Sequence, residues 1–169
     1  MNRQLTLLRH AKSDWDSLSD SDYDRPLSHR GIRDANRVGR WLQEQAYAPD
    51  YIVSSPALRA RQTIEAVNSV LEIAPQHIHY DSNIYMANRE TLLQVLAGIP
   101  KKYSSILLVG HNPGLDELLV YLCAGKPEHS KDGKLLTTAA IASLAMPDNW
   151  KDLPPHACNL LKLIRPKDL

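Results

Sequence analysis

Three apolar runs of the sequence end in side chains that bind phosphate or attack phosphorus. Arg9 and His10 follow the run LTLL, Arg59 comes one helical turn after the run YIVSS, and His111 follows the run ILLVG. Guanidinium groups pair with phosphate oxygens through two hydrogen bonds and stay charged at any working pH. A neutral imidazole is a competent nucleophile near neutral pH. Together these residue types are suited to phosphoryl transfer.

The proximity of the arginines would help both the nucleophile and the transferred group. Cationic neighbours lower the pKa of an imidazole, which keeps its attacking nitrogen free, and they stabilise charge on the phosphoryl oxygens. Each feature alone has an ordinary explanation, because an Arg-His pair can lie in a solvated loop and a turn such as GHNPG can simply join a strand to a helix. Their occurrence after three separate strands favours catalysis.

Short apolar strands alternate with amphipathic helices along the chain and would position these residues. The sequence predicts strands at 4–8, 51–54, 77–81, 105–109, 139–145 and 159–164. It predicts helices at 28–45, from Ser55-Pro56 to about 71, from the cap Asn88 to about 99, and at 115–123. In the first of these, Ile32, Ala35, Val38 and Leu42 form the apolar stripe. The 169 residues fit one domain, an α/β three-layer sandwich with a mostly parallel central sheet flanked by helices.

Ligands of such sheets lie beyond the carboxyl ends of the strands, which is where the histidines and arginines are predicted to converge. Two helix N-termini, at Pro56 and Pro113, would add free backbone N–H groups at the same edge. We expect the strand that ends in Arg9 and His10 to deliver both side chains to this edge, where a phosphate can lie.

Composition excludes several other classes of protein. The net charge is +1, with 43% apolar and 23% charged residues, which gives no electrostatic basis for binding nucleic acid or a membrane. No apolar stretch resembles a secretory signal or a transmembrane span, so we expect a cytoplasmic protein. Cys123 and Cys158 lack the spacing of a zinc site or a redox pair.

The motifs around these residues resemble those of the histidine phosphatase superfamily, the phosphoglycerate mutase-like group. LLRHAK resembles its Arg-His-Gly signature, with Ala11 where glycine is usual, and SSPALRARQT and LLVGHNPG resemble its other two conserved segments. The short chain, with DRPLSHRG and GHNPG, is most similar to the SixA-type phosphohistidine phosphatases. The resemblance covers nearly the whole chain, in order.

The resemblance implies a role for each matching residue. His10 would be the nucleophile that becomes transiently phosphorylated, Arg9 and Arg59 would hold the phosphoryl oxygens, and His111 would hydrogen-bond the transferred group. Arg25 would be a further phosphate-binding arginine, although a salt bridge to Asp24 or Asp22 explains it nearly as well. Ser28 could hydrogen-bond nearby or simply cap a helix. No metal and no cofactor is implied.

The proton donor that larger relatives use has no clear counterpart. The segment SNIYMANRETLL stands roughly where it would lie, and its single carboxylate, Glu90, has the position of a first-turn helix residue. Asp14 and Asp16, in an Asp-rich stretch after His10, are candidate general acids, although a plain solvated loop explains them as well. A site without a dedicated acid would suit a phosphohistidine P–N bond, whose leaving imidazole can already carry its proton.

These observations favour a metal-independent phosphatase that acts on phosphohistidine in a protein partner. A small phosphate ester is the alternative substrate, and a non-catalytic module that senses phosphate or binds a phosphoprotein is a further alternative. Retention of both histidines argues against that module, because binding alone would need only the arginines. A nucleotide-binding switch is excluded by the absence of a glycine-rich P-loop with its lysine.

Overall fold

The computed structural model describes residues 3–169 and contains one mixed sheet in the order β3-β2-β4-β1-β5-β6. In chain order the strands are β1 (Arg3–Arg9), β2 (Tyr51–Ser54), β3 (Ile78–Tyr80), β4 (Ser105–Gly110), β5 (Ile141–Met146) and β6 (Asn159–Ile164). β4 pairs in parallel with β1 and β2, and β2 pairs in parallel with β3. β5 is antiparallel to both β1 and β6, so β5 alone runs against the others. The prediction of a mostly parallel sheet is confirmed.

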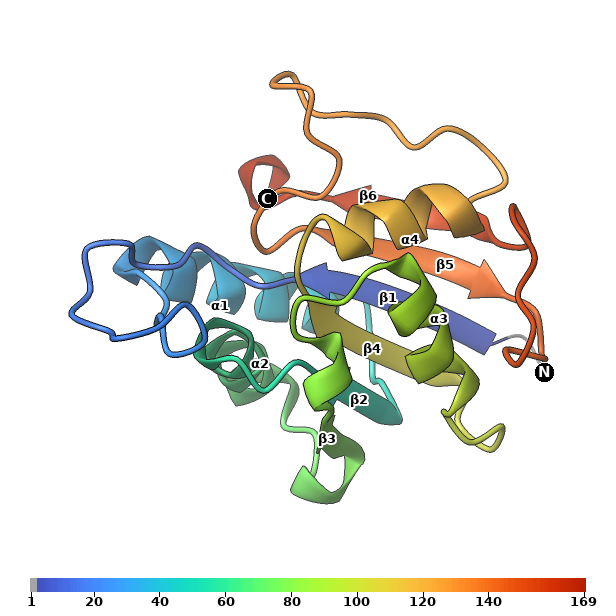
Figure 1. The fold of residues 1–169 in the computed structure, drawn as a ribbon, viewed down its shortest axis with the longest axis horizontal. Coiled ribbons are helices and arrows are strands. Elements are labelled where there is room, and N and C mark those ends of the chain that lie inside the picture. The colour runs from blue at the N-terminus through green and yellow to red at the C-terminus, as the bar shows by residue number, and fades with distance from the viewer. Residues whose placement is uncertain (1–2) are drawn as a thin grey trace.

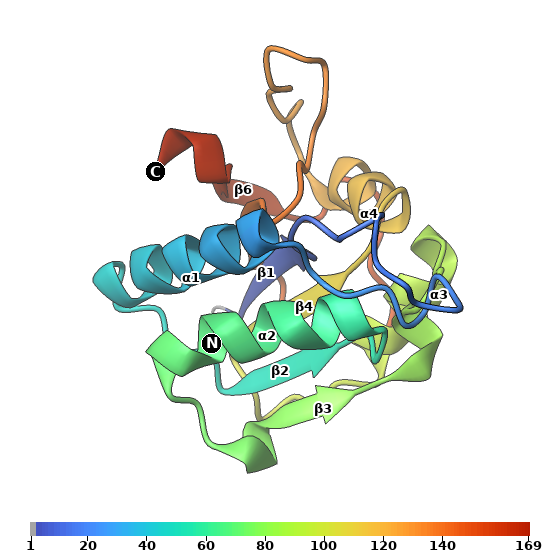
Figure 2. The same ribbon diagram turned by 90° about the vertical axis from the view of Figure 1, so that its left-hand side faces the viewer.

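Helices cover both faces of the sheet and complete three layers (Figure 1). The helices are α1 (His29–Glu44), α2 (Leu58–Leu71), α3 (Arg89–Ala97) and α4 (Gly114–Leu122). α1 and α2 lie side by side on one face, as Figure 2 shows, and α3 and α4 pack on the other. The predicted α/β three-layer sandwich is therefore the observed fold.

Alternation of side chains along the central strands explains why both faces need a helical cover. In β4, Ile106 and Leu108 pack with α3 and α4, whereas Leu107 and Val109 pack with α1 and α2. All four side chains are fully buried. Because successive residues of a strand point to opposite faces, a strand buried on both sides has no polar face.

Some details of the predicted elements are wrong, and the strand predicted at 139–145 begins only at Ile141. α2 begins at Leu58 rather than Pro56, and its N-cap is Ala57 rather than Ser55. The residues around His77 form a short 3-10 turn, so the following strand is limited to Ile78–Tyr80. Ile32 is 41% exposed and lies outside the buried stripe of α1. The predicted caps Ser28 and Asn88 are confirmed, since each accepts a first-turn N–H.

None of the helices in residues 3–169 has the length and apolar character needed to cross a bilayer.

Candidate active site

His10 lies immediately after β1 and its ring orientation is fixed by backbone groups. Its N–H donates to the Gly110 carbonyl at 3.0 Å, which continues the β1–β4 pairing by one residue. Nδ1 donates to the Ala11 carbonyl at 2.7 Å. Because a neutral imidazole has one proton, this contact leaves the lone pair on Nε2. The residue is 8% exposed, so a buried imidazole presents Nε2 as its free nitrogen.

The turn that follows His10 is locked against α2 and α1. The Ala11 N–H donates to Thr63 Oγ1 at 2.9 Å, and the Thr63 hydroxyl donates to the Arg59 carbonyl at 2.6 Å. At the start of α1, Ser28 donates through its N–H and its hydroxyl to the Lys12 carbonyl. These contacts hold the backbone on both sides of the imidazole.

His111 follows β4 and faces His10, with ring centroids 5.2 Å apart. Its Nε2 lies 2.7 Å from Ser55 Oγ, which also accepts the Ala57 N–H at 3.2 Å. When the Ser55 hydroxyl donates to Nε2, the proton of His111 lies on Nδ1. Nδ1 is buried and has no hydrogen-bond partner in the protein.

Both imidazoles are neutral at ordinary pH. Burial, and to a smaller extent the nearby charges of Arg59 and Arg9, lowers the pKa of His10 to about 3. Burial and the charge of Arg59 lower the pKa of His111 to about 4. The expected effect of the arginines is present, but desolvation is the larger cause.

Arg9 and Arg59 approach this pair from β1 and α2. Arg9 donates from Nη1 to the Leu136 carbonyl at 3.0 Å. Arg59 is 6% exposed and donates to Asp22, from Nη1 to the carbonyl at 2.7 Å and from Nη2 to Oδ2 at 3.1 Å. In both arginines Nε is buried without a protein partner, like Nδ1 of His111. The charges of Arg9 and Arg59 act on both imidazoles, so the four predicted side chains lie close to one another. Three of their buried nitrogens have no protein partner.

Arg25 forms the salt bridge that was the alternative to phosphate binding. Its Nη1 lies 2.6 Å from Asp22 Oδ1, its Nε donates to Ser13 Oγ at 3.0 Å, and its guanidinium stacks 3.6 Å above the Trp15 ring. The charge of Arg25 still acts on His111 and lowers its pKa. Arg25 therefore lies near enough to His111 to lower its pKa, while its own guanidinium is held by Asp22 and Ser13.

Sequence reasoning missed two residues of the site, Asp22 and Tyr85. It considered Asp22 only as an ion-pair partner of Arg25, and it did not consider Tyr85. The Asp22 carboxylate accepts hydrogen bonds from Arg25, from Arg59 and, at 2.7 Å, from the Tyr85 hydroxyl. The Tyr85 hydrogen bond and the two arginines lower the pKa of Asp22 to about 2. The Tyr85 ring meets the His111 ring edge-on, with centroids 5.6 Å apart. The signal in the sequence was only the three-residue spacing of Asp22 and Arg25 in a loop.

The candidate acids lie in the loop that leads from His10 to α1. Asp14 Oδ1 accepts the Asp16 N–H at 3.0 Å, and Asp16 is exposed. Glu90 occupies the first turn of α3, as predicted, and forms an ion pair with Arg89 at 2.6 Å. Within residues 3–169, no group of three or more metal-ligating side chains is assembled.

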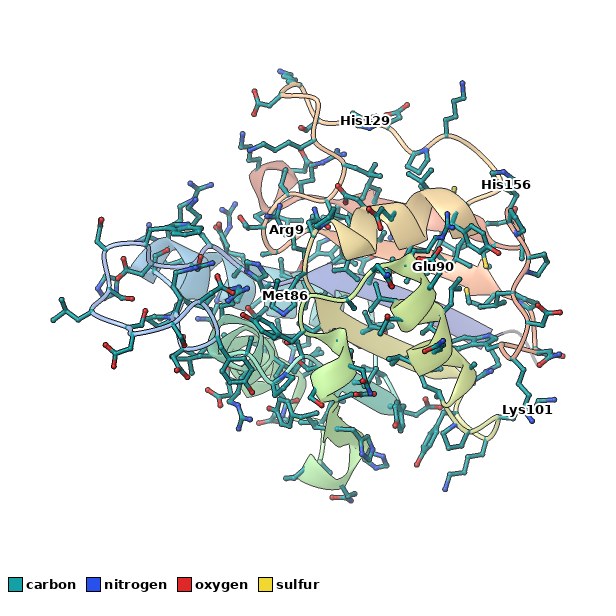
Figure 3. The ribbon with its side chains drawn as sticks, viewed as in Figure 1. Arg9, Met86, Glu90, Lys101, His129 and His156 are labelled. Carbon is teal, nitrogen blue, oxygen red and sulfur yellow. The ribbon has the colours of Figure 1, made fainter. Side chains whose placement is uncertain are left out.

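Arg9 and His129, both labelled in Figure 3, line a cavity of about 740 Å³. The cavity lies between α4 and the loop that carries His129. Basic Arg89 and Lys134 share its wall with acidic Asp116 and Glu117. The mixed charge favours neither an anionic nor a cationic ligand.

Comparison with known proteins places the chain among phosphatases. The family model for the histidine phosphatase superfamily (branch 1) matches residues 5–83. The phosphohistidine phosphatase SixA of Escherichia coli is 30% identical over 170 residues, which cover 93% of this chain and 96% of that protein. An uncharacterised chloroplastic protein of Arabidopsis thaliana is 32% identical over 160 residues, which cover 90% of this chain and 71% of that protein.

Solved structures agree with this placement. A SixA protein from Agrobacterium tumefaciens superposes with a TM-score of 0.79 at 27% identity, over 98% of this chain and 99% of that one. A second, from Nakamurella, gives a TM-score of 0.81 at 28% identity, over 98% and 97% of the two chains. The chain therefore belongs to the histidine phosphatase superfamily, and the enzyme that it forms is a phosphatase.

Proposed function

We propose that the protein removes a phosphoryl group from phosphohistidine in a protein partner, through a covalent phosphohistidine intermediate on His10. The observation that carries this proposal is the set of unpaired buried nitrogens beside His10, namely Nε of Arg9, Nε of Arg59 and Nδ1 of His111. Buried polar groups without partners cost free energy, and a tetrahedral anion would satisfy all three. Such an anion would lie where Nε2 of His10 can reach its phosphorus.

In the first step Nε2 of His10 attacks phosphorus and the bond to the leaving group breaks. The new phosphohistidine has a cationic ring, whose Nδ1 proton stays hydrogen-bonded to the Ala11 carbonyl. Arg9, Arg59 and His111 stabilise the charge on the three equatorial oxygens. In the second step water attacks the same phosphorus, phosphate leaves, and His10 returns to its neutral form with the proton on Nδ1.

The substrate class rests on two supports. The relative from Escherichia coli is a phosphohistidine phosphatase, and its similarity extends over nearly the whole of both chains. A protonated phosphohistidine also leaves as a neutral imidazole and needs no acid, whereas an alkoxide needs a proton in the transition state.

Labelling of His10 tests the covalent mechanism. Brief incubation with an aryl phosphate should give one acid-labile, alkali-stable phosphate per chain, and peptide mapping should place it on His10. His10→Ala should bind phosphate yet show neither label nor turnover. Turnover by His10→Ala at the native rate would refute the mechanism. Tight phosphate binding by a native protein that lacks turnover would favour a sensor instead.

Asp14 and Asp16 remain our candidates for protonating poorer leaving groups. Asp14→Asn or Asp16→Asn should slow the hydrolysis of alkyl phosphates, while phosphohistidine hydrolysis keeps its rate. Unchanged rates on alkyl phosphates for both variants would remove both residues as acids.

A further inference from the structure

Arg9 is held by a backbone carbonyl that is distant in sequence and lies outside any regular element. Its Nη1 donates to the Leu136 carbonyl at 3.0 Å. Leu136 is fully buried, and the segment 135–140 around it forms neither helix nor strand. The regular hydrogen bonds of a helix or sheet therefore do not fix this carbonyl, and its position depends on the side chains that bind the Leu136 backbone.

Two side chains from the segment after β4 bind both polar groups of the Leu136 backbone. Asn112 donates from Nδ2 to the Leu136 carbonyl at 3.0 Å, and the Leu136 N–H donates to Asp116 Oδ1 at 3.0 Å. The Asp116 N–H donates in turn to Asn112 Oδ1 at 3.2 Å. We call these three residues the Leu136 ring. The ring fixes Leu136 to the start of α4, and Leu136 in turn holds Arg9.

The carboxylate of Asp116 and the guanidinium of Arg9 also act on each other through their charges. Burial raises the pKa of Asp116, while the Leu136 N–H, Asn112 and the charge of Arg9 act in the opposite direction. Burial lowers the pKa of Arg9, and the charge of Asp116 opposes that change. Both side chains line the same cavity. A charged oxygen accepts a stronger hydrogen bond than a neutral one, so the charge of Arg9 helps to keep a strong acceptor for the Leu136 N–H.

The hydrogen bond to Leu136 uses one end of the Arg9 guanidinium and leaves another nitrogen unused. With Nη1 bound to the Leu136 carbonyl, Nε remains buried without a protein partner. A rigid guanidinium that is anchored at one nitrogen can present another nitrogen to an anion without reorganising.

We propose that Asp116 is a positioning residue for Arg9, which acts through the Leu136 backbone and keeps Nε of Arg9 available to a phosphoryl oxygen. This inference rests on the proposed function, because it requires Arg9 to bind phosphate. It gives Asp116 no proton transfer and no contact with the substrate. Asp22 holds Arg59 directly, whereas Asp116 holds Arg9 through one intervening residue.

Substitutions at Asp116 test whether the Leu136 ring supports activity. Asp116→Ala should lower kcat/KM on an aryl phosphate about tenfold and weaken competitive inhibition by inorganic phosphate by a similar factor. Asp116→Asn keeps an oxygen for the Leu136 N–H and should lose about threefold or less. Native activity in Asp116→Ala would overturn the proposal, and so would a loss in Asp116→Asn as large as that in Asp116→Ala.

A double-mutant cycle with Arg9→Lys separates the positioning of Arg9 from general damage. Lysine has a single side-chain nitrogen, so it cannot bind the Leu136 carbonyl and present a second nitrogen to phosphate. Arg9→Lys should therefore lower kcat/KM by itself, and Asp116→Ala in that background should change kcat/KM by less than about twofold. An undiminished loss in the Arg9→Lys background would show that Asp116 acts elsewhere and would overturn the proposal.

The dependence on the leaving group distinguishes positioning from proton transfer. The loss in Asp116→Ala should be equal across a series of aryl phosphates, because Arg9 is proposed to act on the transferred group. A loss that grows with the pKa of the leaving group would identify Asp116 as a general acid and overturn the positioning role.

Two further variants control for folding and for the loss of a nearby carboxylate. Asn112→Ala removes the other side chain that binds Leu136 and should show a loss of the same kind, again reduced in the Arg9→Lys background. If Asp116→Ala does not fold, as urea unfolding will show, native kcat/KM in Asn112→Ala overturns the proposal. Glu117→Ala removes the exposed carboxylate next to Asp116 in the first turn of α4 and should keep native activity.

Failure of this inference is distinguishable from failure of the proposed function. Native enzyme that forms no phosphohistidine on His10, or that is unaffected by Arg9→Lys, would overturn the proposed function. Labelling of His10 and impairment by Arg9→Lys, with native activity in Asp116→Ala, would overturn the positioning role alone.

Discussion

At the scale of single residues, a carboxylate organises the arginines that are proposed to hold phosphate. Both terminal nitrogens of Arg59 donate to Asp22, one to its carbonyl and one to its carboxylate. The guanidinium is therefore held in place before any substrate arrives, and Nε is left to meet the anion. Preorganised donors cost no reorganisation during the reaction, which is how such groups stabilise developing charge.

Removal of the Asp22 side chain should therefore slow the chemical step more than it weakens binding of the leaving group. Asp22→Ala takes one partner from each of Arg25, Arg59 and Tyr85, so Arg59 can leave the position in which we propose that it holds phosphate. We expect kcat/KM on an aryl phosphate to fall about tenfold to a hundredfold, mainly through kcat. Steady-state kinetics across a series of aryl leaving groups checks this, because the loss should be equal for all of them.

Asp20→Ala is the control for that experiment, because Asp20 is an exposed carboxylate of the same loop. Its activity on the aryl phosphate should equal that of native enzyme. A rise in kcat/KM for Asp22→Ala would contradict the expectation and would mean that the carboxylate competes with substrate for Arg59.

At the scale of elements, the sequence predicted those features of the fold that hydrophobic periodicity and the order of the strands determine. Alternating strands and helices were enough to place His10, Arg59 and His111 at one edge of the sheet, because the carboxyl ends of parallel strands lie together. The start of α2 was not predictable in this way. Ser55 has the residue type of an N-cap, and its hydroxyl does accept the Ala57 N–H, but α2 begins only at Leu58. The same hydroxyl also lies against His111, which is 56 residues away in sequence, and no local rule predicts that contact.

The Asp22 network escaped prediction for a related reason. Its members come from a loop without periodicity, from α2 and from the segment that contains Tyr85, which is 63 residues from Asp22. No spacing rule connects such positions, and an aspartate in an Asp-rich loop has the same sequence signal as its solvated neighbours. Arg25 was singled out from the sequence, and a salt bridge to Asp22 was part of one of the two interpretations given for it.

The start of α1 shows how one element positions the turn that follows His10. A Cβ at Gly31 would lie 2.1 Å from the Lys12 carbonyl oxygen, which is backbone and cannot rotate away. Gly31→Ala should destabilise the protein by about 2 kcal/mol and lower kcat, because relief of the clash must move Lys12 or α1. Urea unfolding and aryl phosphate turnover measure the two effects.

Gly98→Ala provides the comparison for this substitution. The nearest atom to a Cβ at Gly98 is 3.5 Å away, which is ordinary contact, and the variant should retain native stability within about 1 kcal/mol and native activity. If Gly31→Ala is as stable and active as Gly98→Ala, the close approach of α1 does not position the turn.

At the scale of the whole molecule, burial of two neutral histidines makes folding depend on pH. The pKa values of His10 and His111 in the folded protein are about 3 and about 4, against about 6.5 for an unperturbed histidine. Below about pH 6.5 both histidines bind protons in the unfolded chain but not in the folded chain. The free energy of unfolding should therefore fall as pH is lowered, by up to about 1.4 kcal/mol per pH unit for each of the two histidines.

A single substitution isolates one of these contributions. Between about pH 6 and pH 4.5 both histidines stay neutral in the folded state. Over this range the free energy of unfolding of His10→Gln should fall less steeply than that of native protein. The two slopes should differ by about 1.4 kcal/mol per pH unit. His129→Gln, in an exposed loop, is the control and should keep the native slope. Urea unfolding at several pH values gives the slopes. Equal slopes for His10→Gln and native protein would mean that His10 is charged within the fold, and a charged imidazole could not attack phosphorus.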